Sequence, residues 1–92
     1  MAFTLARVKV RDFAQWKEVF KEGAHIRQAH GSRGVTLFRG ASDPNEVFFL
    51  VEWDNLEQGM ACSASPELRD LQRRSGIISP PELLTSEERI QA

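Results

Sequence analysis

Few side chains in this chain of 92 residues are suited to chemistry, and three of them are predicted to share one site. A guanidinium such as that of Arg39 can bind the phenolate or carboxylate of an aromatic ligand. The carboxylate of Glu52 can act as a base where burial raises its pKa. His30 lies at the edge of an apolar helical face, within reach of a cavity between helix and sheet. We therefore predict Arg39, Glu52 and His30 as catalytic residues of a small-molecule site.

Two alternatives to that site stay open. The charges can instead sit at the mouth of an assembled barrel and pair across a subunit interface. A histidine at a helix end can also be purely structural. The remaining reactive groups favour no other chemistry: Cys62 lies among small residues and is predicted to be a buried, inert thiol. The two histidines are five residues apart on different helical faces, so no metal site is expected.

Composition excludes several classes of function. The net charge of −1 argues against binding nucleic acid through a basic surface. No apolar run approaches the roughly 18 residues of a membrane span. Arg7 and Lys9 interrupt the apolar N-terminal stretch, so it is not a secretory signal, and a cytoplasmic location is expected. No cofactor motif is present, and we expect no cofactor.

Hydrophobic periodicity predicts the elements that must position these side chains. Strands are expected at 3–10, 34–40, 47–53 and 82–86, and those at 34–40 and 47–53 should form an antiparallel hairpin around the turn residues at 41–46. One helix should begin after Asp12 and end at Gly31, with Arg27 on the face that carries its apolar residues. A second helical region, capped by Asp54 and restarted at Ser65-Pro66, should end at Gly76. The order β-α-β-β-α-β predicts a single α+β, ferredoxin-like domain over residues 1–92, with a four-stranded antiparallel sheet.

The predicted sheet has two apolar faces, although helices can cover only one. In strand 47–53, the alternate residues Phe48 and Leu50 are as apolar as their neighbours Phe49 and Val51. The second face is predicted to carry six apolar residues: Phe3, Leu5, Val35, Leu37, Phe48 and Leu50. Because monomers rarely expose so large an apolar patch, we expect this face to pack on its copy in a two-fold homodimer. The alternative is a monomer covered by its own C-terminal tail.

Arg7, Lys9, Arg39 and Glu52 are expected on the same second face, at the rim of that apolar patch. An apolar cavity with a few polar groups is the usual form of a small-molecule site. We therefore predict a ligand-binding set on the inner surfaces of the domain, together with the catalytic residues named above. Its members are Arg7, Leu37, Phe48, Leu50 and Trp16.

Five stretches of sequence together resemble a known superfamily. They are V-x-V-x-D-F-x-x-W-K at 8–17, FRG at 38–40, DPNEV at 43–47, EWD at 52–54 and SPELRDLQRRSGI at 65–77. Over residues 3–86 the chain resembles small proteins of the dimeric α+β barrel superfamily, in its antibiotic-biosynthesis-monooxygenase-like branch. The resemblance implies a homodimer whose two sheets form a barrel. The matched stretches are caps, turns and core positions rather than a catalytic signature.

The resemblance implies two functions of different class. The first is a cofactor-independent monooxygenase or isomerase that acts on an aromatic or polyketide-like small molecule. The second is a non-catalytic dimeric module that binds a small ligand or serves as a stress-type protein. An open cavity with unpaired polar groups would favour the enzyme, whereas a filled interior with Arg7 and Glu52 in salt bridges would oppose it.

Overall fold

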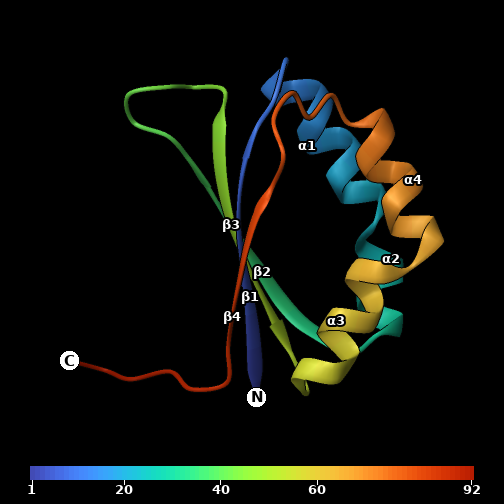
Figure 1. The fold of residues 1–92 in the computed structure, drawn as a ribbon, viewed down its shortest axis with the longest axis vertical. Coiled ribbons are helices and arrows are strands. Elements are labelled where there is room, and N and C mark those ends of the chain that lie inside the picture. The colour runs from blue at the N-terminus through green and yellow to red at the C-terminus, as the bar shows by residue number, and fades with distance from the viewer.

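A computed structural model describes all residues 1–92 and has the predicted order of elements (Figure 1). The strands are β1 (Ala2–Lys9), β2 (Ser32–Arg39), β3 (Glu46–Trp53) and β4 (Glu82–Ser86), and the helices are α1 (Phe13–Glu22), α2 (Ala24–Ala29), α3 (Leu56–Ala64) and α4 (Pro66–Arg74). The strands form one antiparallel sheet in the order β2-β3-β1-β4. All helices cover one face of this sheet, and the chain contains no helix long and apolar enough to cross a membrane.

The first helical segment is two helices rather than the predicted single one. Asp12 begins α1 as expected, because its carboxylate accepts hydrogen bonds from the backbone N–H groups of Ala14 and Gln15. The break falls at Gly23, where a Cβ atom would lie 3.3 Å from the Leu71 side chain of α4. Because glycine has no side chain, Gly23 allows α4 to lie close to the junction of α1 and α2. The sequence pattern could not reveal this contact between distant segments. Gly31 ends the segment with a φ of 85°, as predicted.

The second helical segment has a different first cap from the one predicted. Asn55 caps α3 by accepting a hydrogen bond from the N–H of Gln58, whereas Asp54 forms an ion pair with Arg33. Asp54 is one residue too early for the capping geometry. Ser65 caps α4 with Pro66 in the first turn, as predicted.

The register of β2 corrects one part of the predicted sheet. Val35 pairs with Val51 and Leu37 with Phe49, and these partners face the helices. Val35 and Leu37 therefore lie on the helix-covered face, and Phe38, which pairs with Phe48, lies on the open face. The two sets of side chains along β2 are those predicted, but alternation alone does not say which set faces inward.

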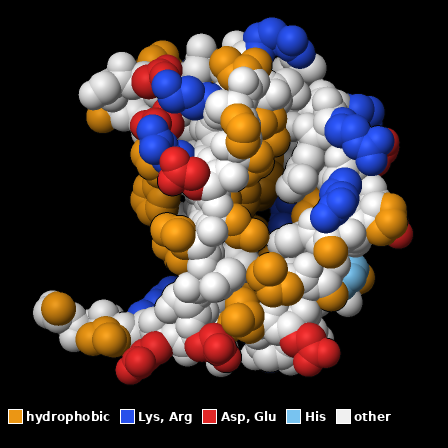
Figure 2. All heavy atoms as spheres, in the orientation of Figure 1, with side chains coloured by type: hydrophobic (Ala, Val, Ile, Leu, Met, Phe, Trp, Pro, Cys, Tyr) orange, Lys and Arg blue, Asp and Glu red, His pale blue; other side chains and the backbone are white.

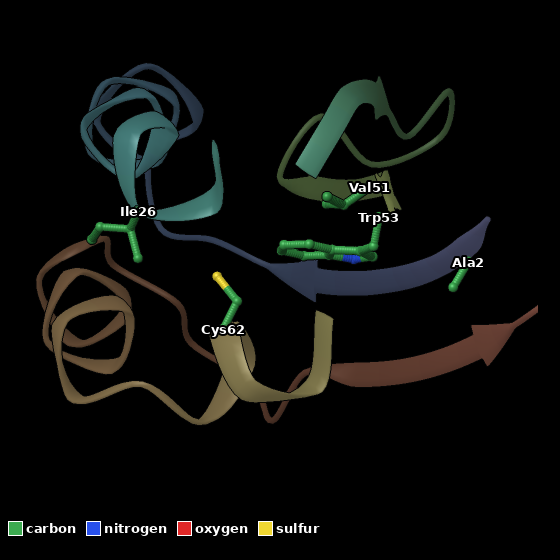
Figure 3. Close-up of a cluster of buried hydrophobic side chains, with 5 residues drawn as sticks. All are labelled: Ala2, Ile26, Val51, Trp53 and Cys62. Atoms are coloured by element: carbon green, nitrogen blue, oxygen red, sulfur yellow. The ribbon is translucent and has the colours of Figure 1, made fainter. Parts of the chain in front are cut away.

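The core between helices and sheet consists of two buried groups. One group joins Trp53 and Val51 of β3 to Ile26 of α2 and Cys62 of α3, with Ala2 at its edge (Figure 3). The other comprises Val8, Val10, Trp16 and Val47. The helices are therefore anchored on β1 and β3, the two central strands of the sheet.

The open face of the sheet is apolar, as predicted. Leu5, Phe38, Phe48 and Leu84 are all exposed there, with Phe38 at 56% and Leu84 at 66%. The C-terminal segment leaves the lower end of β4 in Figure 1 and projects to the side opposite the helices. Arg89 of this segment lies over Phe3, with its guanidinium 5.0 Å from the centre of the ring, and it pairs with Glu52 at 2.7 Å. The tail therefore leaves most of the apolar face uncovered.

Candidate functional site

The main hollow of the molecule lies between the helices and the sheet. It is a cavity of about 810 Å³, bounded by β1, β3 and β4 on one side and by residues of all four helices on the other. Figure 2 shows it open to solvent, with hydrophobic side chains on its walls and Lys and Arg side chains on the helical side of its rim. Apolar walls with a few polar groups are typical of small-molecule sites.

Aromatic rings form much of the cavity wall. Trp16 and Phe20 of α1 stack with ring centroids 4.9 Å apart, and Phe20 lies 5.2 Å from Phe49 of β3. Trp53 lies further along β3, and its indole N–H donates a hydrogen bond to the Thr4 hydroxyl at 3.0 Å. A planar ligand can stack against the faces of these rings.

Arg27 is the most deeply buried charged residue at this site. Its side chain lines the cavity, yet the residue is only 7% exposed. Nη1 donates a hydrogen bond to the Phe20 carbonyl at 3.1 Å, and the guanidinium lies 4.0 Å from the centre of the Phe20 ring. Burial lowers the pKa of Arg27, and the neighbouring Cys62 opposes this effect. An arginine side chain nevertheless stays charged in proteins.

Of the residues predicted for a site, only Trp16 lines this cavity. Arg39 was expected on the second sheet face, and this placement is wrong: Arg39 pairs with Val47 and lies on the helical side. There its guanidinium lies 4.3 Å from the Phe13 ring, and its Nε donates to the Pro44 carbonyl at 2.7 Å. Leu37 was also misplaced and packs beside the buried group around Trp16.

Arg7, Phe48, Leu50 and Glu52 lie on the open face, as predicted. The two charged residues are paired within the chain: Arg7 with Glu46 at 2.6 Å and with Glu82 at 3.3 Å, and Glu52 with Arg89. The hydrogen bond and charge of Glu46 raise the pKa of Arg7. The functional roles assigned to these open-face residues stay predictions.

His30 and Cys62 are held by local packing. His30 ends α2, and its Nδ1 donates to the Ile26 carbonyl at 2.9 Å; it does not line the cavity. Cys62 has no exposed surface, and burial raises the pKa of its thiol, an effect that the nearby Arg27 charge partly opposes. A catalytic role for His30 stays a prediction.

Sequence reasoning placed Arg27 on the buried face of its helix but assigned it no role. The available signal was its position, since Arg27 is a charged residue on an otherwise apolar stripe. Trp53 was predicted as a core residue, and Thr4 was not considered. A cavity between helix and sheet was predicted only in connection with His30, which does not line it, whereas most of the predicted site residues were expected on the open face of the sheet.

Comparison with known proteins agrees with this architecture. Residues 1–74 match the family model for antibiotic biosynthesis monooxygenase. An antibiotic-biosynthesis-monooxygenase-like protein from Bordetella bronchiseptica superposes with a TM-score of 0.81 at 17% identity, covering 97% of both chains. A mutant form of SnoaB, a cofactor-independent oxygenase from Streptomyces nogalater, superposes with a TM-score of 0.79 at 18% identity, covering 98% of this chain and 94% of SnoaB.

Rv0793 from Mycobacterium tuberculosis gives a TM-score of 0.75 at 14% identity, covering 99% of this chain and 97% of the other. A comparison with curated protein sequences finds no match. At these identities the structural neighbours establish the fold alone, whereas the family model covers most of the chain. The chain therefore belongs to the antibiotic biosynthesis monooxygenase family.

Proposed function

We propose that this protein is a cofactor-independent monooxygenase that oxidises an aromatic small molecule bound between its helices and its sheet. The observation that carries the proposal is the aromatic-walled cavity of about 810 Å³. Membership of the family and similarity of fold to a cofactor-independent oxygenase support it. The cavity is large enough to hold a compact polycyclic compound, and its largely apolar walls suit such a ring system.

The reaction needs no external reductant if the substrate supplies the electrons. A phenol or anthrone with an oxidisable ring position reacts with O₂ to give a quinone and water. One oxygen atom becomes the new carbonyl, the other leaves as water, and the substrate loses four electrons and two hydrogen atoms. The protein's contribution is to bind the ring against Trp16 and Trp53 and to stabilise the electron-rich form of the substrate.

Oxygen uptake tests this proposal directly. With anthrone as the probe, we expect O₂ consumption above the uncatalysed rate and one anthraquinone formed per O₂ consumed. Ala6→Leu would fill the cavity, since Ala6 lines it, and should reduce the rate by about 10-fold or more. Ala61→Leu, on the exposed side of α3, is the matched control and should leave the rate unchanged. Equal loss in both variants, or no uptake above background in the parent protein, would contradict the proposal.

A second candidate is a non-catalytic module that binds the same kind of ligand. It is favoured by the absence of Asp, Glu, His, Cys, Lys and Tyr side chains from the cavity lining, so no ordinary general base reaches a bound ligand. The same measurements separate the two. Saturable binding of the probe without O₂ uptake above background would favour the module.

We also propose that the open face is a homodimer interface. The exposed apolar residues support this, and burying them would remove a patch that monomers rarely expose. Sedimentation should give twice the chain mass of 10.4 kDa. Leu50→Lys should dissociate or unfold the dimer because it buries an unpaired charge, whereas Gln15→Lys on exposed α1 should not. A monomeric parent protein would refute this part of the proposal.

A cytoplasmic location belongs to the same proposal. The one cysteine is free and buried, as is usual for proteins of reducing compartments. Fractionation of cells that produce the untagged full-length protein would test it, with recovery outside the cytoplasm as the contrary result.

A further inference from the structure

Arg27 is buried beside the cavity without a carboxylate partner. Phe20 of α1 supplies both of its contacts, a backbone carbonyl acceptor and an aromatic ring. No Asp or Glu lies within ion-pair distance of it, although Arg7, Arg33, Arg74 and Arg89 all have such partners. A guanidinium carries five N–H donors, and one hydrogen bond leaves most of them available.

The other charged residues of the cavity lining are also positive. Arg69 and Arg73 of α4 also line it, and both are exposed at its rim. Neither forms an ion pair, whereas Arg74 on the same helix pairs with Glu22 and Asp70. With no acidic residue in the lining, three guanidinium groups border the cavity without compensation. Such a field attracts anions and raises their local concentration at the site.

A purely structural role explains Arg27 poorly. Removing a guanidinium from water is costly unless an anion or several acceptors replace the water, and here only one protein acceptor does so. Arg39 shows how this chain holds a structural arginine: it stacks on Phe13 and donates to the Pro44 carbonyl while staying exposed to solvent. Arg27, by contrast, is enclosed at the inner wall.

We propose that Arg27 is an anion-binding residue, and that the cavity selects planar apolar ligands that bear an oxyanion such as a carboxylate or phenolate. The ring system stacks on the aromatic wall, and the oxyanion accepts hydrogen bonds from the free N–H groups of Arg27. Arg69 and Arg73 draw the anion to the entrance. The inference rests on the proposed function, because it defines the charge of the ligand that the same cavity holds.

The test compares two ligands of equal shape and different charge. Anthraquinone-2-carboxylate and anthraquinone-2-carboxamide resemble the product of the proposed reaction and do not consume O₂. Both should quench the emission of Trp16 and Trp53, which line the cavity and are the only tryptophans in a chain without tyrosine. We expect the parent protein to bind the carboxylate about 10- to 100-fold more tightly than the amide, as for a hydrogen-bonded charge pair.

Variants locate the source of that preference. Arg27→Gln should reduce the carboxylate-to-amide ratio to below about 3 while binding of the amide persists, and Arg27→Lys should keep part of the preference. Arg11→Gln, at an exposed arginine outside the cavity lining, is the matched control and should leave the ratio unchanged. Arg69→Gln at the rim should change the ratio less than about 3-fold and weaken the dependence of carboxylate binding on salt. If Arg27→Gln does not fold, Arg27→Lys and the parent protein still decide the question, since a Lys variant that keeps the full ratio contradicts guanidinium-specific binding.

The outcomes separate this inference from the proposed function. Equal binding of both ligands to the parent protein, or a full preference retained in Arg27→Gln, would overturn the anion site and leave the cavity as a binding site. Absence of binding by both ligands would overturn the anion site and remove the main support for the proposed function.

Discussion

Replacing Thr4 by Val should destabilise the protein by removing the only acceptor of a buried hydrogen bond. The Trp53 indole N–H donates to the Thr4 hydroxyl at 3.0 Å, and the two residues are 2% and 3% exposed. Valine has nearly the same shape, so the substitution leaves packing intact and the indole donor unpaired. This bond also fixes one wall of the cavity, because both residues line it.

The expected loss follows from that geometry. A buried donor left without a partner costs about 1–3 kcal/mol, and the added apolar methyl group returns part of it. We expect a decrease of about 1–2 kcal/mol in the free energy of unfolding. For a domain of this size, each kcal/mol lowers Tm by about 4–8 °C. Urea denaturation followed by circular dichroism would measure this decrease at a fixed protein concentration, since the proposed dimer would make stability depend on concentration.

A double-mutant cycle isolates the hydrogen bond. In a Trp53→Phe background the donor is gone, so Thr4→Val should cost less than about 0.5 kcal/mol. A loss of the same size in both backgrounds would mean that the effect comes from packing, and the reasoning about the indole donor would be refuted. No loss in the parent background would show that the indole finds another acceptor in the cavity.

Three further changes test other parts of the structure. Gly31→Ala should lower the free energy of unfolding by about 1–2 kcal/mol, because φ is 85° and the new Cβ would lie 2.7 Å from Gln58 Oε1. Gly34→Ala is the control, since its Cβ meets no atom closer than 3.5 Å. Equal decreases in Tm for the two variants would contradict the argument. The folded state raises the pKa of Cys62 and therefore favours the protonated thiol. The stability of the parent protein relative to Cys62→Ala should thus be constant below about pH 8.5 and should fall as the pH rises above that value. Urea titrations at pH 7.5 and 10 would check this, and a stability difference independent of pH would refute it. Arg39→Ala should leave anthraquinone binding within about 2-fold, because Arg39 does not line the cavity, and a large loss measured by tryptophan quenching would restore the role first predicted for it.

Local sequence patterns were sufficient to predict the elements of this fold. The hairpin followed from two apolar runs around the cluster of Asp43, Pro44 and Asn45, and the structure has β2 and β3 on either side of it. Asp12 and Ser65 were predicted as helix caps, and both accept the expected backbone hydrogen bonds. These features depend on residues only a few positions apart, so their physics is contained in short segments.

The location of the site depends on contacts between distant segments. Alternation divides β2 into two sets of side chains, but only pairing with β3 assigns Val35, Leu37 and Arg39 to the helical side. The close contact of Gly23 with α4 involves a helix that lies much later in the chain. Neither the facing of the β2 side chains nor the contact at Gly23 can be predicted from periodicity, because both depend on where another segment of the chain lies.

The chemistry of the site also depends on contacts between distant segments. The sequence by itself determined an α+β sheet with two apolar faces and a charged residue, Arg27, on a buried helical stripe. Only the tertiary structure decided that Arg27 meets no carboxylate and lines a cavity with Trp53 and Thr4. The burial and pairing of a charge are set by every segment packed around it, and those segments come from both ends of the chain.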